Sequence, residues 1–397
     1  GSARREFTVS EKWATPGYLP GLLPAGQWHV ILGLYRIMPG GAHVLVDIEL
    51  LEEPWAEAVV PPAVVGSGLT GPGWYVGDQH CHTEHSDAKG TLQELLTMAR
   101  ARGLDYLGVT DHNTISHHAW LRNTGMIALT GEEMTTYRGH ATVLNADGWV
   151  DFRAHNREEL VALVEDGRRR GGLWFVAHPK QTGCDWEWGD DLWDRHFDGV
   201  EVWNGVWAGR NWQSVARWHR RLAAGARLVA VGGSDRHQPH LPDPDQPLNQ
   251  VGSPATRVWA DGDIVAGLKS GKVSVAEAPT GPWVWIERDG QVVMGETVAV
   301  GTRLNVRVIG DIEDGTRVRV LTDQGVLHDG PAGDVSLDTP SACFVRAEVY
   351  RRPDEAYRRL LTTLQLPGGI SSDEMMAHDV VEGLSNPVYT QQAKPQS

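Results

Sequence analysis

Histidine and carboxylate side chains gather in short motifs early in a strand–helix pattern. His80 and His82 are separated by one residue on an extended segment, so both imidazoles point to the same side of the strand. Asp87 follows after a short turn, and Asp111-His112 follows the next apolar run. Such a mixture suits zinc, manganese or iron, whereas calcium would need oxygen ligands almost throughout. The motifs therefore predict a site for divalent metal ions.

The same residue types recur where later apolar runs end. The full candidate ligand set is His80, His82, Asp87, His112, Glu133, His140, His178, Asp235 and His237. One pair alone is weak evidence, because a lone histidine is more often a surface residue or a satisfied core residue. Polar residues scattered over loops would not fall on successive strand ends, so the order of the set supports the metal site.

Strands alternate with helices from Trp74 onward. Thr91 and Glu94 form a capping box that begins a helix, and Gly103 suits its C-terminal cap. Asp105–Val109 is then expected to be a short buried strand of a β-α-β unit. Further strands are expected at Met126–Thr130, Ala141–Leu144, Leu173–Ala177, Val200–Trp203 and Leu228–Val231, with helices after Asn156 and over Trp212–Ala224. In α/β folds, sites are built at the carboxyl ends of strands, where these candidates lie.

The flanking regions have β patterns without that alternation. The expected domains are residues 1–73, an N-terminal β region; 74–277, the metal-binding α/β barrel; and 278–397, a C-terminal β-sandwich-like region with a tail. In the first, Trp28–Ile37 and His43–Leu51 would pair as strands, and Pro54–Gly73 would be a connector. The tail from Pro367 is expected to be loop and disorder apart from residues 386–389.

Composition restricts the class of protein. The 397 residues carry a formal net charge of -15, which argues against binding to a nucleic-acid backbone and for a site that receives positive charge from bound metal. No apolar run is long enough to cross a bilayer, and no hydrophobic segment follows the first residues as in a signal peptide. A soluble protein is expected; a cytoplasmic location and export with a removed leader both stay open.

These motifs resemble those of the PHP superfamily, named for polymerase and histidinol phosphatase. Residues 77–87 match its first motif, Thr110-Asp111-His112 its second, and Glu133, His140, His178-Pro179 and Ser234-Asp235-Arg236-His237 the others. Trp74-Tyr75, Glu132-Glu133, residues 201–205 and residues 386–389 are more narrowly similar to the CehA/McbA-like metallohydrolases. The resemblance implies a distorted seven-stranded β/α barrel with two or three divalent metal ions, flanked here by β regions.

The resemblance also implies a role for each candidate ligand. His80, His82, Glu133 and Asp235 would hold one metal, Glu133 with His140 and His178 a second, and Asp87, His112 and His237 a third. Asp87 stands where the trinuclear phosphatases use a histidine one residue later, and Ala88 replaces the usual glycine. These departures put the third metal in question. Without it, Asp87 or His112 would be free for proton transfer.

The implied reaction is hydrolysis by a metal-bridging hydroxide, with a small phosphate ester as the leading substrate. Arg236 and Lys180 adjoin candidate ligands and could bind an anionic substrate, whereas Arg138 is interpreted as a solvated loop charge. A carbamate or carboxylic ester is the alternative, because the narrower group includes carbamate hydrolysis. A catalytically inactive binding module is a further interpretation, against which the intact ligand set argues.

A tryptophan-rich segment and Cys81 could each belong either to the core or to the site. Seven tryptophans fall between Trp186 and Trp218 and could form either core or a wall for a sugar, base or aryl ring. Trp203 is expected in the core, and Trp186 and Trp188 are the candidates for the pocket. By strand alternation Cys81 faces away from the metals, so it is expected to be a packed core thiol.

Overall fold

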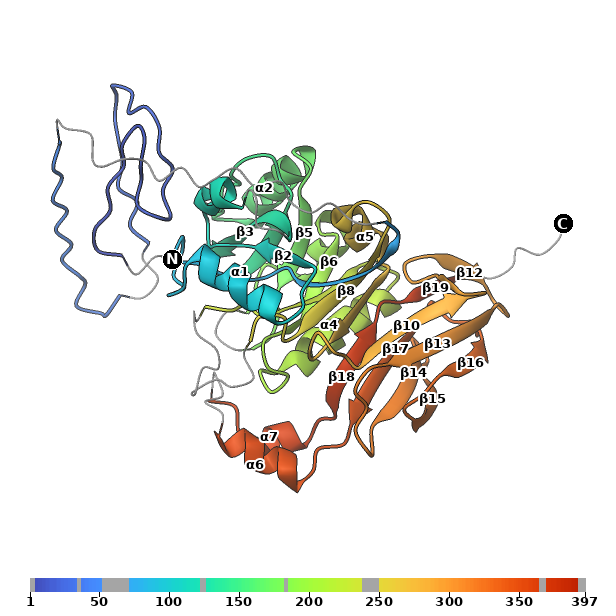
Figure 1. Ribbon diagram of the computed structural model, residues 1–397. Helices are drawn as coiled ribbons and strands as arrows, with labels where there is room; N and C mark the ends of the chain where they lie inside the picture. Colours follow the sequence, from blue (N-terminus) through green and yellow to red (C-terminus); the bar gives the residue numbers. More distant parts are fainter. Residues whose placement is uncertain are drawn as a thin grey trace.

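The computed structural model describes residues 4–33, 37–51, 71–121, 126–181, 185–237, 250–363 and 369–391. Strands and helices alternate through its first half, and α1, α2, α4 and α5 lie around the outside of these strands (Figure 1). The elements of this part are β1 (Gly73–Asp78), α1 (Leu92–Ala101), β2 (Tyr106–Val109), η1 (Ser116–Trp120), β3 (Ile127–Thr136), β4 (Gly139–Leu144), α2 (Arg157–Arg169), β5 (Leu173–Ala177), η2 (Asp190–Leu192), α3 (Trp193–His196), β6 (Gly199–Asn204), α4 (Asn211–Ala223), β7 (Val229–Gly233), β8 (Ala255–Ala260), α5 (Ile264–Ser270) and β9 (Val273–Ala276).

Local sequence signals begin the helices as predicted. Thr91 accepts a hydrogen bond from the backbone N–H of Glu94, and the Glu94 side chain accepts one from the Thr91 N–H. The apolar face of α1 is buried. Asn156 caps α2 by accepting from the backbone N–H of Glu159. These caps satisfy N–H groups that have no partner within their own helix. The predicted starts of both helices are confirmed.

The strands form a mixed sheet that brings its first and seventh strands together. The β1–β2–β3 and β5–β6–β7 pairs are parallel, whereas β4 is antiparallel to both β3 and β5. Just past β7, the backbone N–H of Asp235 donates to the carbonyl of His80 at 2.8 Å, and the carbonyl of Arg236 accepts from His82 at 3.0 Å. The segments that follow β1 and β7 therefore lie side by side.

β3 is longer than the sequence predicted. Met126–Thr130 was expected to end before Glu133, but β3 continues to Thr136 because residues 131–136 pair with β4 in an antiparallel hairpin. Glu133 is therefore inside a strand, with its backbone N–H bonded to the carbonyls of Thr110 and Asp111. The prediction that each candidate ligand follows the end of a strand is therefore wrong for Glu133.

The second half of the chain is mostly β. Its elements are β10 (Trp283–Arg288), β11 (Gln291–Val292), β12 (Thr297–Ala299), β13 (Arg303–Ile309), β14 (Arg317–Thr322), β15 (Gly325–Pro331), β16 (Val335–Asp338), β17 (Phe344–Arg351), α6 (Glu355–Thr363), α7 (Ser372–Met376), β18 (Val380–Ser385) and β19 (Val388–Gln391). β11, β10, β13 and β16 form a separate four-stranded sheet that shares a buried aliphatic core with β14 and β17. Facing sheets of this kind bury their apolar faces against each other.

The tail is more ordered than predicted. β18 is buried along its whole length and pairs with β9 and β17, so the large sheet continues across residue 277. The short run Val380-Val381-Glu382-Gly383-Leu384 gives little local signal, and pairing on both sides decides its structure. Loop was the wrong prediction for residues 380–385; residues 392–397 lie outside the described part.

The strands expected near the N-terminus are not found among the described residues. Residues 28–33 and 37–51 contain no strand, and Figure 1 shows the described residues between 19 and 51, in blue, projecting from one side. Leu45 and Leu50 are 86% and 91% exposed. An alternating pattern specifies which face would be buried, but it supplies no surface to bury that face. The predicted connector falls largely on residues 52–70, outside the described part.

Within the described residues, no helix is both long and apolar enough to cross a membrane.

Candidate metal centre

The fold brings all nine candidate ligands into one neighbourhood. His80 and His82 follow β1, Asp87 precedes α1, His112 follows β2, Glu133 is within β3, His140 is on β4, His178 follows β5, and Asp235 and His237 follow β7. Ion-pair contacts link every one of these side chains to another member of the set. Residues spread over more than 150 positions of sequence thus converge, because successive strands deliver their ends to one edge.

The first group surrounds one oxygen of Glu133. The donor atoms of His80, His82, Glu133 and Asp235 all lie within 4.8 Å of one another. Glu133 Oε2 is 3.4 Å from His80 Nε2 and 3.3 Å from His82 Nε2, and Asp235 Oδ1 is 2.9 Å from His82 Nε2. Two imidazoles and two carboxylates at these separations could hold a divalent cation.

The second group gathers mostly on the other oxygen of Glu133. Glu133 Oε1 is 2.8 Å from His140 Nδ1 and 3.1 Å from His178 Nε2. His112 also joins this group, with its Nδ1 2.8 Å from Glu133 Oε2. The carboxylate of Glu133 therefore stands between two sets of histidines.

A third group lies nearest the solvent. His82, Asp87, His112 and His237 have donor atoms within 4.8 Å of one another. Asp87 Oδ1 is 3.2 Å from His237 Nε2 and 3.5 Å from His112 Nε2. The side chain of Asp87 is 32% exposed, whereas that of His82 is fully buried. Asp87 and His237 are the most exposed of the nine candidate ligands.

The charges of the centre shift its pKa values in opposite directions. Burial raises the pKa of Glu133 and of Asp235, but the neighbouring histidines outweigh burial and hold both well below their usual range. Burial lowers the pKa of His82, but the carboxylates of Asp235 and Glu133 outweigh it and raise the value to about 9. For His112, burial prevails and lowers the pKa to about 4. Cation binding at His82 would therefore displace a proton.

Several buried atoms of the first group lack a hydrogen bond to any described residue. They are His80 Nε2, His82 Nε2, Glu133 Oε2 and Asp235 Oδ1. The 2.9 Å approach of His82 to Asp235 is close, but its geometry is not that of a hydrogen bond. Buried polar atoms in proteins are normally paired. Four orphaned atoms that face one another fit a divalent cation, which would accept a lone pair from each.

Two further carboxylates form hydrogen bonds with a candidate ligand or with the loop that follows one. Glu201 on β6 lies between the strands that carry His178 and Asp235, and it accepts a hydrogen bond from His80 Nδ1 at 2.9 Å. Asp111 accepts from the backbone N–H of Thr83 at 2.8 Å and so holds the loop after His82. Both residues lie inside motifs that were matched from the sequence, but no role was predicted for either. A carboxylate on a strand between two ligand-bearing strands was the available signal for Glu201.

The expected substrate-binding cations do not face open space. Lys180 is 4% exposed, and its ammonium donates to Asn204 O at 2.7 Å and Asn211 Oδ1 at 2.9 Å. Arg236 is 1% exposed. Arg138 is an exposed turn residue, as expected, with its guanidinium 5.2 Å from the ring centre of Trp188. Arg236 follows the end of β7, where an isolated parallel bridge pairs its backbone with Cys81.

Trp186 and Trp188 are core residues and not an accessible pocket wall. Their exposed fractions are 3% and 2%, and they pack in the same hydrophobic cluster as Trp203. The chain between β5 and β6 folds inward over them because burial of large rings contributes strongly to stability. Burial of Trp203 and Cys81 is confirmed.

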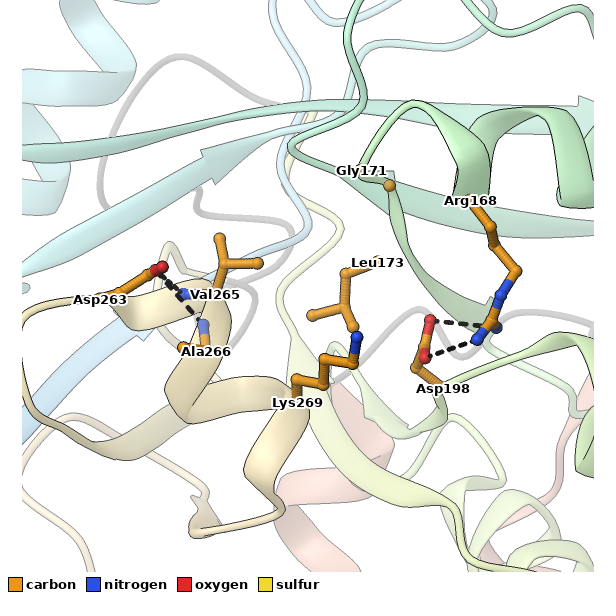
Figure 2. Close-up of a pocket in the computed structure, with 9 residues that line it drawn as sticks. Arg168, Gly171, Leu173, Asp198, Asp263, Val265, Ala266 and Lys269 are labelled. Atoms are coloured by element: carbon orange, nitrogen blue, oxygen red, sulfur yellow. Dashed lines mark hydrogen bonds and ion pairs between the residues drawn. The ribbon is translucent and has the colours of Figure 1, made fainter.

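A pocket of about 280 Å³ lies at the other end of the strands. Its lining residues are Arg168, Gly171, Gly172, Leu173, Asp198, Asp263, Val265, Ala266 and Lys269. Figure 2 shows Arg168 paired with Asp198, and Asp263 bonded to the first turn of α5. Leu173 begins β5 and Asp198 precedes β6, so this pocket is at the amino ends of strands whose carboxyl ends lead to the metal centre. Its acidic groups already have partners, so it is not the candidate site.

Comparisons with known proteins give distant likenesses. No protein-family model matches the chain. An uncharacterized protein from Methanocaldococcus jannaschii is 27% identical over 142 residues, which cover 32% of this chain and 80% of that protein. A solved two-domain protein from Bacteroides vulgatus, containing a predicted PHP-like metal-dependent phosphoesterase, shares 15% identity with a TM-score of 0.41, over 74% of this chain and 94% of that one. A solved amidohydrolase from Chromobacterium violaceum shares 17% identity with a TM-score of 0.28, over 41% and 87% of the two chains. These likenesses are too distant to assign a function to this chain.

Proposed function

We propose that this protein is a metal-dependent hydrolase of the PHP type, built on a seven-stranded β/α barrel and closest to the CehA/McbA-like group. The observation that carries the proposal is the convergence of the four orphaned buried atoms of His80, His82, Glu133 and Asp235. A purely structural core would have paired or excluded such atoms, because each unpaired buried polar atom costs about 1–3 kcal/mol. Their persistence together supports a site that binds a cation.

The metal positions follow from the two oxygens of Glu133. Oε2 faces His80 and His82, and Oε1 faces His140 and His178, so Glu133 would bridge two cations. Asp87, His112 and His237, with His82, would hold a third where it is bound. Zinc, manganese and iron all suit these nitrogen and oxygen ligands.

The bound cations and the residues around them would have different roles in hydrolysis. Two divalent cations, when bound, would lower the pKa of a shared water, orient it and neutralise charge that develops on the substrate oxygens. Glu133 would set the separation of the two positions. Asp87, at the solvent-facing side, or His112 beside it would pass a proton to the leaving oxygen when the third position is empty. His85 Nδ1 lies 2.7 Å from Ser116 Oγ, but both side chains are buried, so this pair is not proposed as a nucleophile.

A small phosphate ester is the proposed substrate, and a neutral ester is the second candidate. Two cations suit the negative charge of a phosphate, which the net charge of -15 would otherwise repel. One observation favours a carbamate or carboxylic ester instead: the ammonium of Lys180 is already bonded within the chain, and Arg236 is buried. Phosphate binding would then depend on the metals alone.

The test compares substrates that share one leaving group. Metal-loaded protein would be assayed with the 4-nitrophenyl phosphate ester, an N-methylcarbamate and an acetate, with Glu133→Gln as the inactive control. Faster hydrolysis of the phosphate supports the phosphoesterase proposal, whereas faster hydrolysis of a neutral ester supports the second candidate. Fewer than two tightly bound transition metals per chain, with no turnover of any substrate, would favour a binding module over an enzyme.

A further inference from the structure

We propose that Glu201 is a positioning residue that orients one ligand of each of the two metal positions. This inference rests on the proposed metal centre and adds to it a carboxylate that is not itself a ligand. Glu201 lies on β6, is 1% exposed, and contacts both His80 and the backbone of His178. These residues belong to opposite sides of Glu133.

The contact with His80 decides which ring nitrogen is available. Glu201 Oε1 accepts from His80 Nδ1 at 2.9 Å. Because the proton then resides on Nδ1, the lone pair of Nε2 is directed toward Glu133 Oε2, 3.4 Å away, and Asp235 Oδ1, 3.5 Å away. A carboxylate behind a metal-binding histidine fixes both its tautomer and its ring orientation.

The contact with His178 acts on the backbone. Glu201 Oε2 accepts from the His178 N–H at 2.9 Å, just past the end of β5. His178 has a φ of 29°, outside the ordinary range for a residue with a side chain. This conformation directs Nε2 to within 3.1 Å of Glu133 Oε1. The hydrogen bond from Glu201 helps hold that unfavourable backbone in place.

The surroundings of Glu201 leave it little freedom to move. Asn204 Nδ2 donates to Oε2 at 3.2 Å. A Cβ atom added at Gly233 would lie 2.4 Å from His80 Cβ and 2.5 Å from Glu201 Oε1, so this close approach requires glycine. Glu201 is therefore held against both ligands by the neighbouring strand.

Glu201→Gln is the informative substitution. Glutamine has one accepting oxygen and one donating nitrogen, so it cannot accept from both His80 and His178 as the carboxylate does. Metal affinity should fall about 10- to 100-fold at both positions, as is usual when such a supporting group is lost. Cobalt titration, followed by visible spectroscopy and calorimetry, would measure each affinity. Ring ¹⁵N shifts in the zinc-loaded protein would report whether His80 keeps its proton on Nδ1.

Two matched variants separate positioning from general damage. Glu132→Gln changes a carboxylate that is equally buried and accepts from the Val150 N–H, so it should bind both metals normally. His140→Ala removes a side chain that contacts Glu133, and it should weaken mainly one position. Only Glu201→Gln should weaken both positions without removing a ligand.

Glu201→Asp keeps the inference testable if the glutamine variant does not fold. Aspartate keeps two accepting oxygens but is one methylene shorter, so it should give intermediate affinities and restore part of the His80 tautomer. Wild-type affinity and tautomer in either folded variant would overturn the positioning role, as would weakening of one position alone. A wild-type protein that binds no transition metal would instead overturn the proposed function.

Discussion

The metal centre and the C-terminal β region both bury charged side chains, but they neutralise them differently. In the β region, Glu348 is 1% exposed, and its two oxygens accept hydrogen bonds from Arg346 and from Arg319 Nε. Arg319 also donates to Asp379 at 2.7 Å, and the guanidinium of Arg346 lies 5.2 Å from the ring centre of Trp218. In the metal centre, Glu133 is equally buried, but one of its oxygens has no hydrogen bond to a described residue.

The difference separates a structural charge cluster from a binding site. Arginine keeps its charge at all ordinary pH values and donates in a fixed planar geometry, so the Glu348 cluster is complete within the chain. Histidine is positive only when protonated, and its neutral nitrogen offers a lone pair. The metal centre therefore combines carboxylates with groups that either bind protons or bind a cation. Burial alone does not distinguish the two clusters; the partners do.

The largest expected effect is that of Glu133→Gln. Metal content should fall below one per chain, and kcat/KM should fall roughly 1000-fold, or about 4 kcal/mol, because one group connects both positions. Metal analysis and steady-state kinetics would measure these effects. Two retained metals with near-normal turnover would contradict the bridging role of Glu133.

Glu348→Gln should give the opposite result. The variant should lose about 3 kcal/mol of unfolding free energy, because the buried guanidinium of Arg346 loses its counter-charge and Arg319 keeps only Asp379. Its metal content and kcat/KM should match those of the wild type. Burial raises the pKa of Glu348, but Arg346 and Arg319 outweigh it and lower the value to about 2. The stabilisation is therefore complete above the unfolded pKa of about 4.5 and is lost as pH falls toward 2. Denaturant unfolding across this range should show a shallower acid decline in the variant.

Metal removal should lower stability in proportion to the number of sites that lose a metal. At free metal 100-fold above the dissociation constant, each site adds about 2.7 kcal/mol, which a chelator would abolish. The same loss should occur in Glu348→Gln, since contributions from separate sites are additive. Melting curves with and without chelator would test this for both proteins. Unequal losses would mean that the two clusters are energetically coupled.

The smallest expected effect is at His219, beside the C-terminal charge cluster. Arg346 Nε donates to His219 Nδ1 at 3.1 Å, and burial together with the charge of Arg346 lowers the pKa of His219 to about 4. Because the unfolded chain binds this proton near pH 6.5, stability should decline as pH falls from 6.5 to 4, by about 1 kcal/mol after solvent screening. His219→Asn, which keeps an acceptor but does not titrate, should remove that part of the decline. An unchanged pH profile of unfolding would contradict this role.

Local patterns predicted the elements that carry the metal centre. The Thr91 and Asn156 caps, the helical period after each, and the short apolar runs that became β2, β5, β6 and β7 were all readable, because each depends on residues within one turn or one strand. Strand alternation placed His80 and His82 on one side and Cys81 on the other. The order of polar residues after successive strands then predicted that the nine candidate ligands belong to one metal site.

Tertiary structure decided which of the other side chains became partners. The tail strand β18, the buried Trp186 and Trp188, and the engagement of Lys180 with Asn204 and Asn211 depend on segments far apart in sequence. Adjacency to a ligand suggested an open cation at Lys180 and Arg236, but burial and pairing are properties of the packed chain. The same is true of Glu201 and Glu348: sequence identifies each as a carboxylate on a strand. Only packing gives one of them histidine partners and the other arginines, because a charge is neutralised by whatever the fold places within hydrogen-bond distance.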